Sequence, residues 1–148
     1  MYKFNSPLLW SCAILCVSLA GCGTNLSVKG KVTYPDGKPL EGGVICFDDG
    51  KNMARGNITK NGTFVLGSEG TRDGIPQGKY RVYFQGTSGA AVHPDTGVNM
   101  EVERVAAKFQ SIDKSGLSCD IDKSKSVEFT VEYPTPNGLK WSKSKVSN

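Results

Sequence analysis

The chain has 148 residues, of which 38% are hydrophobic and 22% charged, and its formal net charge is +4. This length accommodates one domain with short appendages. The 18 glycines, set among many short apolar runs, favour strands joined by turns over long helices. The basic residues are spread singly along the sequence, so we expect no nucleic-acid partner.

The N-terminal segment has the features of a secretory signal. Residues 8–20 form an uncharged apolar run behind Lys3. The run is too short for a bilayer span, which takes about 20 apolar residues. It ends in LAGC at 19–22, a branched apolar residue and two small residues before a cysteine. This lipobox pattern predicts a signal peptide over residues 1–21.

Cys22 is the predicted site of lipidation. Cleavage before it would leave a lipid on its thiol, and further acyl chains would make the anchor stable. We then expect residues 22–26 to be a tether and the protein to lie in a bacterial cell envelope, anchored to a membrane facing the periplasm or the cell surface. The alternatives are an ordinary signal peptide with a coincidental cysteine, or a short buried strand.

Alternation of apolar and polar residues predicts seven strands after the tether. In the first, Val28, Val32 and Tyr34 share one face with Gly30, while lysines occupy the other face. Turn residues such as Asn-Gly at 61–62 separate consecutive strands. The predicted strands cover about residues 27–34, 43–48, 53–59, 63–67, 79–86, 117–121 and 125–133. This pattern is typical of an all-β, antiparallel sandwich.

Two segments lack a strand pattern. Residues 87–100 contain the single histidine, His93, and are predicted to be a long loop of the kind that often carries function. A short helix is expected around residues 104–109. Residues 134–148 are predicted to be a mobile basic tail, in which Trp141 either packs back on the sandwich or serves as a contact.

Cys46 and Cys119 are the two cysteines that remain after Cys22. An oxidising compartment favours a disulfide between them. Strand alternation argues against it, because Ile45 and Phe47 look like core residues and point Cys46 outward, while Cys119 should point inward. Thiols on opposite faces cannot reach bonding geometry.

The order of several short motifs resembles that of a known domain family. The motifs are VKGKV at 28–32, DGKPL at 36–40, GGV at 42–44, NGTF at 61–64, GIPQGKYRV at 74–82, KF at 108–109, SGL at 115–117 and the strand at 127–131. Together they resemble carboxypeptidase regulatory-like domains, and the lipobox makes the chain similar to small lipoproteins of planctomycete-type bacteria. The resemblance covers residues 27–133. It implies a transthyretin-like, seven-stranded Greek-key β-sandwich without a defined activity.

We therefore expect a non-enzymatic binding or structural module, held to the membrane through Cys22, with an unknown protein or glycan partner. The alternative is a carbohydrate- or peptide-binding lipoprotein that uses exposed rings, for which Tyr34, Tyr83 and Trp141 are available. His93 and Trp141 are the candidate binding residues.

Catalytic and metal sites are not expected. Transthyretin-like hydroxyisourate hydrolases rely on several His and Arg residues and a characteristic C-terminal tetrapeptide, whereas this chain has one histidine and ends in KVSN. No Asp, Ser or Cys partner for His93 is evident. Residues 48–52 (DDGKN) superficially resemble a calcium loop but lack its ligand spacing, so we predict a turn and no cofactor.

Overall fold

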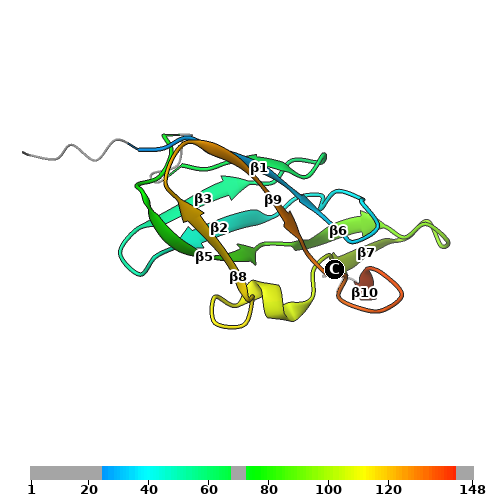
Figure 1. Ribbon diagram of the computed structural model, residues 1–148. Helices are drawn as coiled ribbons and strands as arrows, with labels where there is room; N and C mark the ends of the chain where they lie inside the picture. The colour runs from blue at the N-terminus through cyan, green and yellow to red at the C-terminus, as the bar shows by residue number, and fades with distance from the viewer. Residues whose placement is uncertain (1–24, 68–72, 143–148) are drawn as a thin grey trace, which may run out of the picture.

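The computed structural model describes residues 25–67 and 73–142, and this part of the chain is all-β apart from one short 3-10 helix. Its strands form three sheets, none of them closed into a barrel (Figure 1). None of its helices has the length and apolar character needed to cross a membrane.

The three sheets differ in size. The first has the order β4 (Thr63–Val65), β1 (Val28–Thr33), β9 (Lys125–Thr130). The second has the order β3 (Met53–Asn57), β2 (Val44–Asp48), β5 (Gly78–Gln85), β8 (Leu117–Ile121). The third has the order β10 (Lys140–Ser142), β7 (Asn99–Glu103), β6 (Ser88–Val92). The 3-10 helix, η1 (Ala107–Gln110), follows β7.

The first two sheets share one hydrophobic core. Phe47 of β2 lies at its centre, with ring centroids 5.8 Å from Phe129 of β9 and 6.4 Å from Phe64 of β4. In β1 the alternation is confirmed, because Val28 and Val32 are buried while the intervening lysines are exposed. Each large apolar side chain buried in this way contributes about 2 kcal/mol to folding.

All seven predicted strands are present in the structure, with ends that shift by a few residues. The predicted antiparallel arrangement is wrong for one pair: β1 and β9 run parallel, with Val28 opposite Lys125 and Thr33 opposite Thr130. Alternation reports which residues share a face, and it carries no information on the direction of the neighbouring strand.

The predicted loop at 87–100 is instead a hairpin formed by β6 and β7. Its first strand reads SGAAV, and these small residues bury little surface, so the alternation that marks a strand is weak. The strand is held by its pairing with β7.

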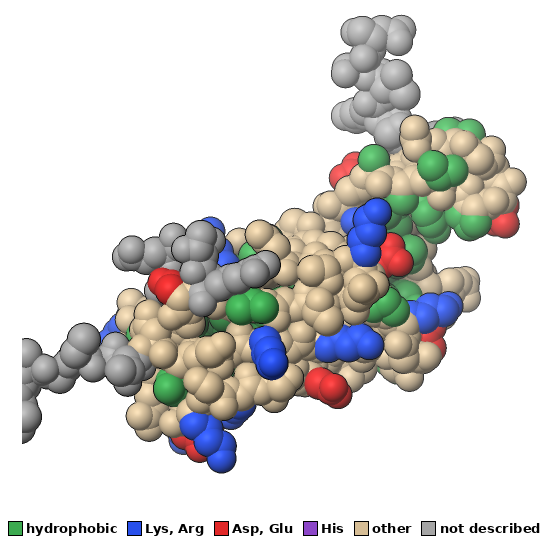
Figure 2. Space-filling view, turned by 90° about the horizontal axis from the view of Figure 1, so that it is seen from above, with side chains coloured by type: hydrophobic (Ala, Val, Ile, Leu, Met, Phe, Trp, Pro, Cys, Tyr) green, Lys and Arg blue, Asp and Glu red, His purple; other side chains and the backbone are tan. Residues whose placement is uncertain are grey.

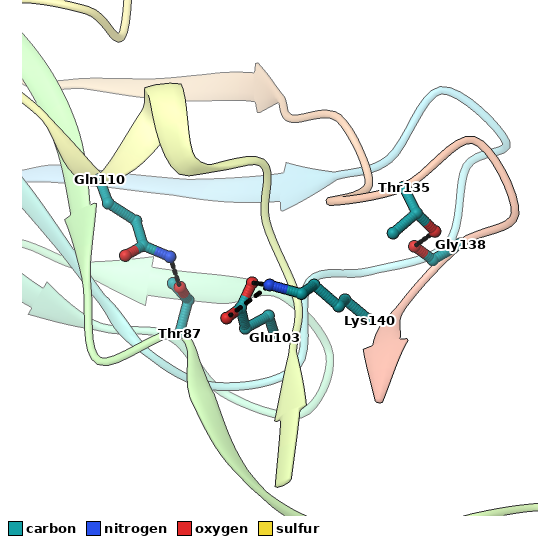
Figure 3. A network of polar contacts seen from close by, with 6 residues as sticks. All are labelled: Thr87, Glu103, Gln110, Thr135, Gly138 and Lys140. Carbon is teal, nitrogen blue, oxygen red and sulfur yellow. Dashed lines mark hydrogen bonds and ion pairs between the residues drawn. The ribbon is translucent and has the colours of Figure 1, made fainter. Parts of the chain in front are cut away.

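Part of the predicted tail is also a strand. β10 pairs with β7 and places Trp141 opposite Val102, while Lys140 Nζ lies 3.3 Å from both carboxylate oxygens of Glu103 (Figure 3). The rest of the predicted tail, residues 143–148, lies outside the described residues, as do the predicted signal peptide and Cys22.

Cys46 and Cys119 are both free thiols. Cys119 is half-buried and packs against the core, as predicted. Cys46 lies opposite Arg55 and Tyr83 in its sheet, on the face away from the core, yet it is fully buried. Burial raises the pKa of the Cys46 thiol, so it is a weak nucleophile.

Gly30 allows the Phe64 ring to pack over β1, which gives a test of the core. A Cβ at residue 30 would collide with the Val127 carbonyl oxygen and lie 2.7 Å from the Phe64 ring. We expect Gly30→Ala to lower the free energy of unfolding by about 2–3 kcal/mol, measured by urea denaturation. Gly89→Ala is the matched control, because its Cβ meets only the flexible Arg104 guanidinium, at 3.3 Å. Equal losses in the two variants would contradict this packing.

Candidate functional site

Tyr34 and Tyr133 form a stacked pair at one end of the two-sheet core. Because β1 and β9 are parallel and in register, the chain leaves both strands at the same end, and the Val131 N–H donates to the Thr33 carbonyl (2.9 Å). The two tyrosine rings follow directly, with centroids 3.8 Å apart and planes inclined by 10°. Parallel pairing therefore brings together two rings that are distant in sequence.

Hydrogen bonds fix both hydroxyl groups. The Tyr34 hydroxyl donates to the Arg104 carbonyl (2.7 Å), and the Tyr133 hydroxyl donates to Asp36 Oδ2 (3.0 Å). Burial, followed by the neighbouring Tyr133, raises the pKa of Tyr34 well above its ordinary value. Partial desolvation acts to raise the pKa of Asp36, but hydrogen bonds from the Lys38 backbone N–H and the Tyr133 hydroxyl hold it below its usual value. At neutral pH, Asp36 is therefore a carboxylate beside two protonated tyrosines.

His93 and Trp141, the two candidate binding residues, are brought together by the third sheet. His93 follows β6 and Trp141 lies in β10, and their ring centroids are 4.8 Å apart. The predicted lack of a partner for His93 is wrong: the Asp95 backbone N–H donates to its Nδ1 (3.2 Å), and Asp95 Oδ2 lies 3.9 Å from the same atom. With Nδ1 as acceptor, the neutral ring carries its proton on Nε2.

The two aromatic pairs line one groove of about 890 Å³. Its lining residues come mainly from the segment after β1, the β6–β7 hairpin and the segment before β10, and these segments lie at the right-hand end of Figure 1. Figure 2 shows hydrophobic side chains gathered at this right-hand end of the molecule. The lining residues are Tyr34, Asp36, Lys38, Pro39, Glu41, His93, Pro94, Asp95, Arg104, Tyr133, Pro136, Asn137, Gly138, Leu139 and Trp141.

The charged groups of the groove are of both signs. Asp36, Glu41 and Asp95 supply carboxylates, while Lys38 and Arg104 supply cations. Lys38 lies 3.4 Å from Asp36, whereas the side chain of the half-buried Arg104 makes one long hydrogen bond to the described residues, from Nη1 to the Thr87 carbonyl (3.4 Å). A guanidinium carries five N–H donors, so Arg104 has donors to offer a ligand.

The groove presents both hydrogen-bonding and apolar groups to a ligand. Among the described residues that line it, the hydroxyl groups are those of Tyr34 and Tyr133, which donate to the Arg104 carbonyl and to Asp36 Oδ2. Carboxylates accept and cations donate hydrogen bonds, while the rings present apolar faces. A polyhydroxylated ligand can use all three kinds of contact.

Two polar contacts hold the segment that closes the groove. The Lys140–Glu103 ion pair ties β10 to β7, and the Thr135 hydroxyl donates to the Gly138 carbonyl (2.9 Å), closing the loop before β10 (Figure 3). Gln110 Nε2 donates to the Thr87 hydroxyl (3.4 Å), which links η1 to the start of the hairpin (Figure 3). The Lys140–Glu103 and Gln110–Thr87 contacts join residues that are far apart in sequence, whereas the Thr135–Gly138 contact is local.

Two further candidates lie outside the groove. Tyr83 is 8% exposed and lies opposite Cys46 on another face of the protein, so it cannot join Tyr34 and Trp141. Residues 48–52 form the predicted turn: Asp48 Oδ1 accepts from the Gly50 N–H (2.7 Å), and Asp49 Oδ1 accepts from the N–H groups of Lys51 (2.8 Å) and Asn52 (2.6 Å). These carboxylates serve as caps of their own turn.

No family model matches the chain, and no curated protein matches it. A solved structure similar to it is the crystal structure of a 9R-lipoxygenase from Cyanothece PCC8801, with 16% sequence identity and a TM-score of 0.35. The match covers 78% of this chain and 18% of the lipoxygenase chain, and a likeness this low carries no functional argument.

The raised pKa of Tyr34 predicts a loss of stability at high pH. The folded protein keeps a proton that the unfolded chain releases, so the contribution is fully present below about pH 10 and declines above it, by up to about 1.4 kcal/mol per pH unit. We expect Tyr34→Phe to flatten this decline while costing about 1 kcal/mol at pH 7 through the lost hydrogen bond. Urea denaturation at several pH values tests it, and identical slopes in both proteins would contradict the assignment.

Proposed function

We propose that this protein is a membrane-anchored, extracytoplasmic and non-enzymatic binding module whose ligand occupies the groove. The observation that carries the proposal is the meeting of His93 and Trp141, at 4.8 Å, beside the stacked Tyr34–Tyr133 pair. Aromatic and charged side chains from three separate segments converge there, which is the usual composition of a ligand site.

A carbohydrate is the ligand class that the groove favours over a peptide. Sugar hydroxyls both donate and accept, which matches carboxylates such as Asp36 and Glu41 beside the free donors of Arg104. The apolar face of a sugar ring packs against aromatic rings such as Trp141. A plain apolar or singly charged ligand would leave part of this mixed lining unused.

The scaffold supports the same proposal. We infer that β4-β1-β9 and β3-β2-β5-β8 correspond to the seven-stranded Greek-key sandwich of carboxypeptidase regulatory-like domains, with β6, β7 and β10 added at one end. The motif order over residues 27–133 supports this correspondence. Placement of a binding site on loops and additions at the end of a rigid sandwich is common.

Truncation of Trp141 tests the ligand class. On a glycan array, we expect Trp141→Ala to lose about tenfold or more in affinity for the bound sugar, because it removes a stacking surface. Met53→Ala is the control, since Met53 is 38% exposed and lies outside the groove lining. A blank array, or equal binding by both variants, would count against a carbohydrate ligand.

Replacement of Cys22 tests the anchor. Cys22→Ala removes the thiol that would carry the lipid, so we expect the protein to leave the membrane fraction on cell fractionation. Cys12→Ala, the same change within the predicted signal peptide, should leave the distribution unchanged. Retention of Cys22→Ala entirely in the membrane fraction would refute the predicted lipid anchor.

A further inference from the structure

A second hollow, of about 600 Å³, lies on the side of the molecule and shares no lining residue with the groove. It gathers three basic residues: Lys29 and Lys31 of β1 and Arg55 of β3. The remaining lining residues are Gly30, Asn57, Thr59, Thr63, Phe64, Val65 and Ser126, so no acidic side chain is among the described residues of its wall. Lys29 and Lys31 are two residues apart in the sequence, and the fold brings the distant Arg55 to them.

Sheet geometry explains the gathering. Lys29 and Lys31 share the outward face of β1, because Val28 and Val32 take the core face. Arg55 joins these lysines because β3 lies beside the segment that follows β4: the Arg55 backbone N–H and carbonyl both hydrogen-bond to Gly67 at 3.0 Å. Small uncharged residues such as Thr63 and Ser126 leave the space between the basic side chains open.

These three cations have no carboxylate partner within 4 Å among the described residues. By contrast, ion pairs to carboxylates are made by Lys38, Lys79, Arg81, Lys108, Lys125 and Lys140. Glu128 lies opposite Lys31 on β9, but it makes no ion pair with it. Like charges two residues apart on one strand face repel each other, so an anion bound between them would relieve that repulsion.

We propose that this hollow binds the phosphate-bearing headgroups of an anionic membrane. The chain is held in place from Leu26, whose N–H and carbonyl pair with Ile75 at 2.7 and 3.0 Å. Lys29 is three residues further on, about 10 Å along an extended chain. The four residue-to-residue steps from Cys22 to Leu26 reach at most about 14 Å. The closeness of the hollow to a bilayer rests on the proposed lipid on Cys22, whereas its chemistry does not.

The test separates the hollow from the anchor. Residues 22–148, which contain every strand described here, would carry Cys22→Ser and therefore no lipid. Sedimentation with vesicles of phosphatidylcholine containing about one-third phosphatidylglycerol, against vesicles of phosphatidylcholine alone, measures binding at about 0.05 M salt, where surface charges are weakly screened. We expect a clear preference for the anionic vesicles.

The variant Lys29→Gln/Lys31→Gln/Arg55→Gln should lose most of that binding. Each basic residue near an anionic surface contributes about fivefold, so the expected loss is roughly one hundredfold. The control Lys51→Gln/Lys114→Gln/Lys123→Gln makes the same change in net charge with exposed residues outside the hollow, and should lose several-fold at most. Equal losses in the two variants, or no preference for anionic vesicles, would overturn the proposal.

Inorganic phosphate, added at constant ionic strength, identifies the source of the anion. Vesicle binding that persists supports the lipid headgroup, whereas displacement by about 10 mM phosphate would assign the hollow to free phosphate and overturn the lipid assignment. The Trp141→Ala and Cys22→Ala experiments report on the groove and the anchor. A negative result in the vesicle experiment therefore does not contradict the proposed function. A negative result with Trp141→Ala or Cys22→Ala does not contradict the anion-binding chemistry of the hollow.

Discussion

The ring of Phe47 is the contact on which the rest of the molecule depends. It touches Phe64 and Phe129 from the opposing sheet and Tyr80 from its own, so a single side chain locks the two sheets to each other. Removing a buried ring of this kind typically costs 3–5 kcal/mol, which is a large part of the stability of a small domain. Neither the groove nor the basic hollow contains such a core of its own. Both are formed by chain segments that the core holds in position.

Parallel pairing of β1 with β9 places the groove at one end of that core. Had the two strands run antiparallel, the residues after them would emerge at opposite ends, and Tyr34 could not stack on Tyr133. Arg104 lies at the same end of the core. The Ala106 N–H donates to the Glu132 carbonyl (3.0 Å), which links the segment after β7 to the segment after β9. The groove is thus a consequence of strand direction, and its aromatic pairs have backbone hydrogen bonds as their support.

Strand faces could be predicted from the sequence, and strand partners could not. Val28, Val32, Phe64 and Phe129 are buried as alternation predicts, because the side-chain period of a strand is set by its own backbone. The direction of β9 beside β1 depends on connections elsewhere in the chain. The β6–β7 hairpin was missed because Ser88–Val92 is made of small residues, although Met100 and Val102 of β7 do alternate with polar neighbours. His93 and Trp141 could be chosen from their residue types alone. Their contact could not be predicted, because it depends on the β6–β7 hairpin and on β10, neither of which the sequence pattern predicts.

The attachment of the chain and the opening of the groove lie at opposite ends of β1. Leu26 is fixed before that strand and Tyr34 follows it, and six residues of strand span about 20 Å. With a lipid on Cys22 and headgroups against Lys29 and Lys31, β1 would run along the membrane surface. The groove would then open about 20 Å to the side of the point of attachment, where a long polymer could enter it without displacing the anchored end.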